Sequence, residues 1–330
     1  MTQNNDIRFP FSLGSDNHSA VHPRILNAIA AVNIGCAPSY GTDPVTSEAV
    51  QVFKRHFGDH VDVHFCFNGT AANILALAPL FKPHHSLLAS EHAHINVDEC
   101  AAPERQLGLK IIPIHNTNGK LTPDQLESHL VRRGDQHFAQ VRGISITQPT
   151  ELGTLYSLDE MAAISSFCKK HGLWLHVDGA RFANAAERLG VSFKQLAEGV
   201  DVLSFGGTKN GLLFGEAVVF MSTAARQAAT EFPYLRKQLM QLPSKTRFVA
   251  AQFVEYLGTD LWREIAKNAC DRATELSLGL GRDPRIQITQ NVQSNAVFAT
   301  IDRPLMKLLR DAAFFYVWNE KTNECRLMTS

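Results

Sequence analysis

The chain has 330 residues, 45% of them hydrophobic and 19% charged, which is typical of a soluble globular protein with one large domain and a smaller one. Lysine plus arginine equals aspartate plus glutamate at 32 each, so nothing in the charge supports a nucleic acid or an anionic membrane as partner. The six cysteines lack zinc-type spacing, no apolar run reaches the ~18 residues of a membrane span, and the start lacks signal-peptide features. We therefore expect a cytoplasmic protein with reduced thiols.

Short apolar runs alternate with amphipathic segments along the first two thirds of the chain. The runs predict strands at 61–67, 86–90, 109–114, 141–147, 173–178, 200–205 and 215–221. The segments between them predict helices at 70–81, 122–131, 157–172 and 180–190, the second capped by Thr122 and the third ended by Gly172. Because the strands are almost continuously apolar, we expect an α/β fold around a buried, mainly parallel sheet.

The pattern changes after about residue 220. Long helices are expected at 244–258 and 261–281, followed by strands at 295–301 and 324–330. We therefore expect an N-terminal arm and a large domain over residues 1–258, and a small α+β domain over residues 259–330. The last strand runs to the end of the chain, so the small domain is expected to be incomplete.

Ligands of open parallel sheets bind beyond the carboxyl ends of the strands, so candidate binding and catalytic residues are expected at those ends. After the first predicted strand, Gly69 allows close approach of a ligand to the backbone, and Thr70 can cap the following helix. A helix start with free N–H groups is an anion site. The segment lacks the GxGxxG pattern of dinucleotide sites, and a structural turn without a ligand is the alternative.

Two later strand ends carry ionisable residues. Asp178 in "LWLHVDGAR" is either ordinary Asp-Gly turn chemistry or a carboxylate that holds a proton on a ring nitrogen. Lys209 in "SFGGTKNG" is either an ordinary turn lysine or a reactive amine. A reactive amine must be deprotonated, which costs an unperturbed lysine roughly 4–5 kcal/mol at neutral pH. Together with the turn at Gly69, the two match a pyridoxal 5'-phosphate site: Schiff-base lysine, pyridinium partner and phosphate cradle.

The segments "SDN", "FNGTAAN", "HVDGARFANA" and "SFGGTKNG" resemble the threonine aldolases, in the fold-type-I superfamily of pyridoxal-phosphate (PLP) enzymes. The resemblance covers nearly the whole chain and is closest to the low-specificity L-threonine and phenylserine aldolase branch. It implies a large domain with a mostly parallel seven-stranded sheet and a smaller C-terminal α+β domain. It also implies active sites shared between subunits of a homodimer or homotetramer.

The resemblance assigns the cofactor-binding residues one by one. It makes Lys209 the lysine that forms the Schiff base and Asp178 the partner of the pyridinium nitrogen. It places Arg181 at the phenolic oxygen of the cofactor. The residues that it assigns to the phosphate are Asn68, Gly69, Thr70 and Thr208.

The substrate-binding residues follow from the same resemblance. His94 would stack on the cofactor ring near the substrate hydroxyl, and Ser15 and Arg326 would hold the substrate carboxylate. Tyr40 would reach in from the neighbouring subunit. Some relatives carry a histidine in the loop after the strand 141–147, where this chain has Glu151, so His94, a water molecule and the Glu151 loop are alternatives for the general base. Relatives also continue past the Arg326 strand into a terminal helix.

We therefore expect retro-aldol cleavage of threonine, allo-threonine or phenylserine to glycine and an aldehyde. The alternatives are another fold-type-I enzyme, a β-eliminating lyase or aminotransferase, and a non-catalytic phosphate-binding protein that uses only the turn at residues 69–70. His92, His94, Asp98 and Glu99 could form a metal site if the histidines alternate on a strand, but the fourth ligand is unspecified and we expect no metal. Lys245 and Arg247 either contact a partner's phosphate or lie on a solvated helix face.

Overall fold

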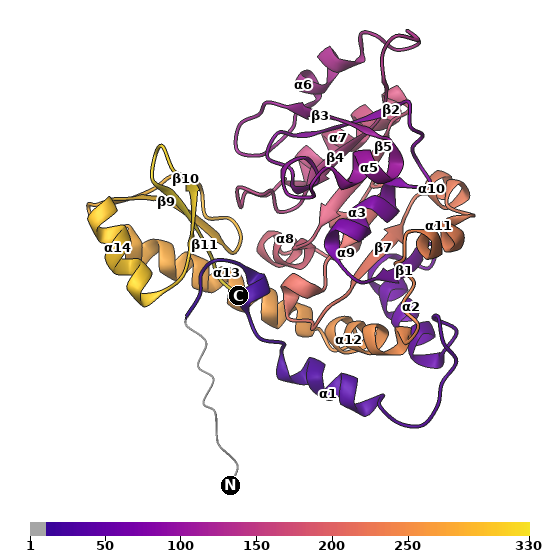
Figure 1. Ribbon diagram of the computed structural model, residues 1–330, viewed down its shortest axis with the longest axis horizontal. Helices are drawn as coiled ribbons and strands as arrows, with labels where there is room; N and C mark the ends of the chain where they lie inside the picture. Colours follow the sequence, from indigo (N-terminus) through magenta and orange to yellow (C-terminus); the bar gives the residue numbers. More distant parts are fainter. Residues whose placement is uncertain (1–10) are drawn as a thin grey trace.

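A seven-stranded sheet forms the centre of the larger part of the molecule (Figure 1). The structure is a computed structural model that describes residues 11–330. The expectation that the chain has no signal peptide was based partly on residues 1–10, which lie outside the described residues. The strand order is β1-β7-β6-β5-β4-β2-β3. The strands are β1 (Asp62–Cys66), β2 (His85–Ser90), β3 (Lys110–Ile114), β4 (Gln140–Thr147), β5 (Trp174–Gly179), β6 (Val202–Phe205) and β7 (Glu216–Phe220).

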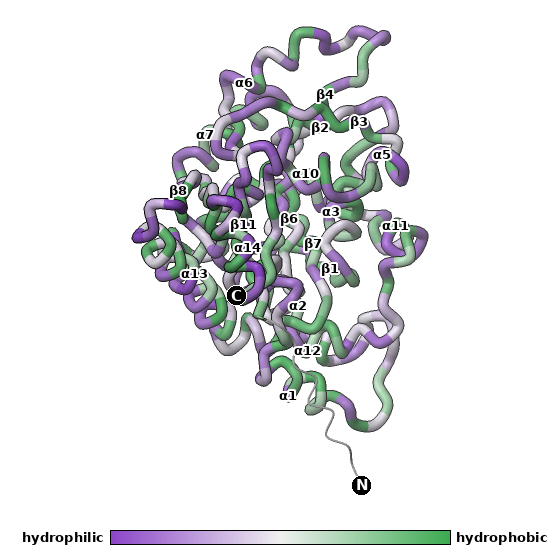
Figure 2. The backbone as a smooth tube through the Cα atoms, turned by 60° about the vertical axis from the view of Figure 1, so that its left-hand side comes forward, coloured by the Kyte–Doolittle hydropathy of each residue, from purple (hydrophilic) through white to green (hydrophobic). Residues whose placement is uncertain are grey.

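The five strands β3, β2, β4, β5 and β6 pair in parallel, and β7 runs antiparallel to both of its neighbours. Neighbouring residues of one strand enter different hydrophobic cores: Val218 packs on one face of the sheet and Val219 on the other. This alternation buries both faces, as the continuous apolar runs predicted. Figure 2 shows the interior strand β6 coloured largely as hydrophobic. The expected α/β fold with a mostly parallel sheet is confirmed.

Helices cover both faces of this sheet. The larger core lies under α1 (Pro23–Ala31), α2 (Pro44–Phe57), α6 (Pro123–Glu127), α7 (Leu158–His171), α8 (Phe182–Leu189), α9 (Phe193–Leu196) and α12 (Thr246–Gly258). The other face is covered by α3 (Gly69–Leu77), α4 (His94–Val97), α5 (Ala102–Leu107), α10 (Thr223–Ala228) and α11 (Phe232–Gln238). Helices α1 and α12, far apart in sequence, lie side by side in Figure 1.

The C-terminal elements form a smaller α+β part around a four-stranded antiparallel sheet of order β10-β11-β9-β8. Its elements are α13 (Leu261–Leu280), β8 (Ile286–Ile288), β9 (Ala296–Ile301), α14 (Arg303–Ala312), β10 (Tyr316–Asn319) and β11 (Glu324–Met328). Leu13 of the N-terminal segment joins the core of this part, and its carbonyl accepts from the N–H of Met328 at 2.7 Å. The domain boundary proposed at residue 258 falls between α12 and α13. Among residues 11–330, none of the helices combines the length and the apolar character that a membrane span requires.

Two predicted helices are shorter than their patterns suggested. The helix expected at 70–81 ends at Leu77: Ala78 still has a helical backbone and bonds Ile74, but Pro79 has no N–H to continue the helical hydrogen bonds. The helix expected at 122–131 is α6 followed by one 3-10 turn, η2 (Ser128–Leu130). Both segments still pack against the sheet through buried leucines, so the layer arrangement is unaffected.

Candidate active site

A cavity of about 580 Å³ lies where the carboxyl ends of the parallel strands face the small sheet. Every site residue predicted above lines it except Tyr40: Ser15, Asn68, Gly69, Thr70, His94, Asp178, Arg181, Thr208, Lys209 and Arg326. Tyr40 is 46% exposed and stacks under the ammonium group of Lys237, 5.2 Å from the ring centre. The structure of one chain therefore collects the predicted cofactor and substrate residues, and the role of Tyr40 stays a prediction.

Lys209 lies in the one-turn helix η3 (Thr208–Asn210) directly after β6. The two preceding glycines are needed because the backbone is packed too closely for a side chain. A Cβ atom on Gly206 would lie 2.1 Å from the carbonyl oxygen of Ala180, and one on Gly207 would lie 2.3 Å from that of Gly215. Burial lowers the pKa of Lys209, and the positive charge of Arg181 lowers it further. The amine is thus closer to its neutral, nucleophilic form than a surface lysine.

The turn that presents Lys209 is closed by β7. Glu216 at the start of this strand is 6% exposed, and its Oε2 accepts from the N–H of Gly207 at 2.6 Å. Thr208 Oγ1 accepts from the N–H of Gly215 at 3.2 Å. Burial raises the pKa of Glu216 to about 7. We did not select Glu216 from the sequence, because its proximity to Lys209 depends on the pairing of β6 with β7.

Asp178 lies near the end of β5 and is 6% exposed. Its Oδ1 accepts from the N–H of Ala180 at 2.9 Å, and its Oδ2 accepts from Nδ2 of Asn73 at 2.8 Å. Burial alone would raise the pKa of Asp178, but these two hydrogen bonds, together with the charges of His94 and Lys209, hold the pKa below its ordinary value. The carboxylate therefore stays ionised at neutral pH and faces the same cavity as Lys209.

The turn between β1 and α3 provides free backbone donors. Asn68 caps α3: its Oδ1 accepts from the N–H of Ala71 at 2.9 Å. The expectation that Thr70 is the cap is wrong, because the asparagine two residues earlier occupies that position. Gly69 and Thr70 form the first turn, whose N–H groups have no acceptor within the helix, and a Cβ on Gly69 would meet open space. This is the geometry of a phosphate-binding helix start.

Arg181 and Ser15 are held by the N-terminal segment. Arg181 Nε donates to Oδ2 of Asp16, whose Oδ1 accepts from Nδ2 of Asn295 at 2.8 Å. Ser15 caps the one-turn helix η1 (Asp16–His18), its Oγ accepting from the N–H of Asn17 at 3.2 Å. Asp16 is 4% exposed and was not selected from the sequence, although it is part of the "SDN" segment. It fixes the guanidinium group of Arg181 at the wall of the cavity.

Arg326 reaches the cavity from β11 of the small sheet. Its guanidinium carbon lies 5.0 Å from the ring centre of Trp318, and its Nε is buried without a hydrogen-bond partner in residues 11–330. Burial lowers the pKa of Arg326, and the nearby charge of Arg181 adds to this effect. A partly buried guanidinium group with a buried, unpaired Nε donor is a strong site for a carboxylate.

His94 lies at the start of α4, and its backbone N–H donates to Oε1 of Glu151 at 2.9 Å. Thr147 Oγ1 donates to the same oxygen at 2.6 Å. The assumption that His92 and His94 alternate on a strand is wrong, because β2 ends at Ser90 and the chain turns before α4. No cluster of three or more metal-ligating side chains is present in the part of the chain that the structure describes.

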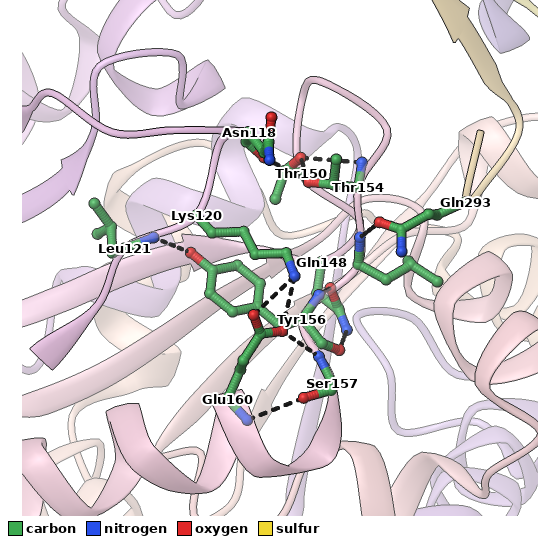
Figure 3. A network of polar contacts seen from close by, with 11 residues as sticks. Asn118, Lys120, Leu121, Gln148, Thr150, Thr154, Tyr156, Ser157, Glu160 and Gln293 are labelled. Carbon is green, nitrogen blue, oxygen red and sulfur yellow. Dashed lines mark hydrogen bonds and ion pairs between the residues drawn. The ribbon is translucent and has the colours of Figure 1, made fainter. Parts of the chain in front are cut away.

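The loop that carries Glu151 is closed by the polar network in Figure 3. Gln148 bonds the backbone of Tyr156 in both directions: its Oε1 accepts from the N–H at 2.9 Å and its Nε2 donates to the carbonyl at 2.8 Å. The hydroxyl oxygen of Tyr156 accepts from the N–H of Leu121 at 2.7 Å. Leu155 N–H donates to Gln293 at 3.0 Å, which ties the loop to the small-domain side of the cavity. These hydrogen bonds therefore hold the loop that carries Glu151 in place.

Comparisons with known proteins show the family of the chain. Residues 12–304 match the family described as beta-eliminating lyase. The low specificity L-threonine aldolase of Pseudomonas aeruginosa is 43% identical over 90% of this chain and 86% of its own length. The one of Pseudomonas sp. is 41% identical over 92% and 88%. The solved structure of Leishmania major threonine aldolase covers 97% of this chain and 94% of its own, with a TM-score of 0.91 at 29% identity.

The family match and the two relatives each cover most of the chain. The chain belongs to the beta-eliminating lyase family and, within it, to the low-specificity L-threonine aldolases.

Proposed function

We propose that this protein binds pyridoxal 5'-phosphate in the cavity and cleaves β-hydroxy-α-amino acids, L-threonine and L-allo-threonine among them, to glycine and an aldehyde. The observation that carries the proposal is that Lys209 and Asp178 line one cavity together with a free helix start. The similarity to named L-threonine aldolases supports the choice of substrate class.

The residues of the cavity fit this cofactor. The first-turn N–H groups of Gly69 and Thr70 suit a phosphate, and Lys209, with its lowered pKa, suits an aldehyde. The ionised carboxylate of Asp178 suits a protonated ring nitrogen. When bound, the cofactor supplies an electron sink for the pair of electrons released as the Cα–Cβ bond of the substrate breaks.

The other residues bind and orient the substrate. The unused donor of Arg326, with the hydroxyl of Ser15, holds the substrate carboxylate. Fixing the carboxylate and the amine sets which bond at Cα is broken. His94 lines the same cavity and accepts the proton of the β-hydroxyl group, which is required for release of the aldehyde. Glu151 holds the backbone of His94 in place.

We also propose that the protein acts in the cytoplasm as a homodimer or homotetramer whose subunits share active sites. Phe67 and Phe214 line the cavity and are 39% and 36% exposed, and Leu213 and Tyr40 are 45% and 46% exposed. Such apolar exposure favours contact with a second copy of the chain. Sedimentation measurements test the assembly, and Tyr40→Phe tests the contribution of that hydroxyl group to activity.

The test of the function uses purified protein loaded with pyridoxal phosphate. We expect a visible absorbance band that is lost in Lys209→Ala, and aldehyde release from L-threonine or L-allo-threonine in an assay coupled to alcohol dehydrogenase. Release of ammonia and a keto acid would instead indicate a β-eliminating lyase, and a keto acid without ammonia would indicate an aminotransferase. A colourless protein that cannot be loaded would indicate a non-catalytic phosphate-binding protein.

A further inference from the structure

Three carboxyl groups surround His94 beneath the cavity, and two of them lie in a continuous hydrogen-bonded chain with it. The side chain of Glu99 is completely buried, and its Oε1 lies 2.9 Å from Nδ1 of His94. Asp178 belongs to the same series of hydrogen bonds. The Glu151 carboxylate, in contrast, accepts from the backbone N–H of His94. Glu99 lies between α4 and α5 and Asp178 on β5, so no local pattern predicts that they are connected.

Asn73 connects the two carboxylates. Its Nδ2 donates to Oε1 of Glu99 at 2.8 Å and to Oδ2 of Asp178 at 2.8 Å. An amide nitrogen carries two hydrogens, so one side chain satisfies both acceptors. Asn73 is 2% exposed and lies on α3, the helix whose start faces the proposed phosphate site. The chain therefore runs from His94 through Glu99 and Asn73 to Asp178.

This geometry determines which nitrogen of His94 can act on the substrate. Oε1 of Glu99 faces two nitrogen atoms, Nδ2 of Asn73 and Nδ1 of His94. Burial and the charge of Asp178 raise the pKa of Glu99, and its hydrogen bonds to His94 and Asn73 oppose this. When Glu99 is ionised, its Oε1 can only accept, so the shared proton lies on Nδ1 of His94. The second ring nitrogen, Nε2, is then without a proton in the neutral ring, and the His94 side chain, which is 35% exposed to solvent, lines the cavity.

We propose that Glu99 and Asn73 are positioning residues that make Nε2 of His94 the proton acceptor for the substrate β-hydroxyl group. The proposal rests on the aldolase function proposed above. In each cleavage the β-hydroxyl proton moves to Nε2, the Nδ1 proton stays in its hydrogen bond to Glu99, and the resulting imidazolium is stabilised by that carboxylate. The same division of roles holds for any histidine base oriented by a buried carboxylate.

The charges around His94 support this assignment. The hydrogen bond to Glu99 raises the pKa of His94 above its ordinary value, against the effect of burial. Asp178 also raises it and Lys209 lowers it. A histidine with a raised pKa accepts a proton more readily, which suits a general base.

The first experiment uses protein without cofactor. We would titrate the histidine side chains by NMR after selective carbon-13 labelling and identify His94 from the signal missing in His94→Asn. In Glu99→Gln, which keeps an acceptor for Asn73, we expect the pKa of His94 to fall by about one unit or more. The signals of the other histidines report whether the variant is folded. An unchanged pKa of His94 in folded Glu99→Gln would overturn the proposal.

The matched control is Glu127→Gln. Glu127 also pairs with a histidine, its Oε2 lying 3.2 Å from Nε2 of His171, but its side chain is 56% exposed. We expect this variant to leave the titration of His94 and the activity unchanged. A shift of His94 in Glu127→Gln as large as that in Glu99→Gln would mean that the effect is unspecific, and would also overturn the proposal.

The second experiment uses the loaded enzyme. Glu99→Gln should lower kcat by about tenfold or more, leave KM nearly unchanged, and move the acidic limb of the kcat profile to lower pH together with the pKa of His94. A change in KM alone, or an unshifted limb, would contradict the positioning role. If the wild type released no aldehyde, the proposed function would fail, whereas the titration without cofactor would still report whether Glu99 pairs with His94.

Discussion

Replacing Glu216 by glutamine should prevent part of the loss in the free energy of unfolding that occurs as the pH rises. Glu216 is 6% exposed and holds the turn before Lys209 by accepting from the N–H of Gly207. A glutamine of the same shape keeps this hydrogen bond through its amide oxygen. The variant therefore isolates the effect of the charge from the effect of the contact.

The magnitude follows from the pKa of Glu216, which burial raises from 4.5 to about 7. A carboxyl group with a raised pKa in the folded state takes up a proton on folding, so the protein loses stability as the pH rises from 4.5 to about 7. This difference in pKa corresponds to about 3 kcal/mol. Glutamine has no charge at any of these pH values, so the variant should escape this loss.

The assay is urea unfolding of the cofactor-free protein at pH values on either side of this window, at constant protein concentration. We expect the free energy of unfolding of Glu216→Gln, relative to wild type, to increase by about 3 kcal/mol from the acidic to the alkaline end. Glu198→Gln, a change at an exposed glutamate, should follow the wild type. Parallel pH dependences of wild type and Glu216→Gln would refute the reasoning.

Three further predictions concern the cavity. Asp178→Asn removes the ionised partner of the ring nitrogen and should weaken pyridoxal phosphate binding at least about 100-fold in a fluorescence titration, since breaking a buried charge pair costs about 3–5 kcal/mol; unchanged affinity would contradict the assignment. Arg326→Leu should raise KM for L-threonine by about tenfold to 100-fold while the absorbance band of the loaded protein persists; an unchanged KM would place the substrate carboxylate elsewhere. Gly206→Ala should destabilise the protein by more than about 3 kcal/mol in thermal unfolding, because its Cβ would lie 2.1 Å from the carbonyl oxygen of Ala180; a stable variant would show that the turn relaxes easily.

Local patterns in the sequence were sufficient to find the residues at the strand ends. Lys209 and Asp178 each follow an apolar strand and precede a turn, and parallel strands bring such ends to one edge of the sheet. The same reasoning assigned the helix start at Gly69. It chose the wrong cap, because Asn68 and Thr70 are both suitable cap residues and only the backbone geometry distinguishes them.

The residues that support the site could not be found in this way. Asn73 contacts Asp178 across 105 residues of sequence, and Asp16 contacts Arg181 across 165. Asn73 lies within a helix whose pattern suggests only core packing, and nothing local marks it as polar support for a carboxylate. Such contacts depend on the order of strands in the sheet and on the return of the N-terminal segment to the small domain.

Covalent attachment of the cofactor to Lys209 is the central claim of the proposed function. Borohydride reduction of the loaded protein, followed by proteolysis and mass spectrometry, locates that attachment directly. We predict that the reduced cofactor is found on the peptide that contains Lys209 and is absent from it in Asp178→Asn loaded under the same limiting concentration. Attachment to another lysine, or no attachment in the wild type, would contradict the central claim.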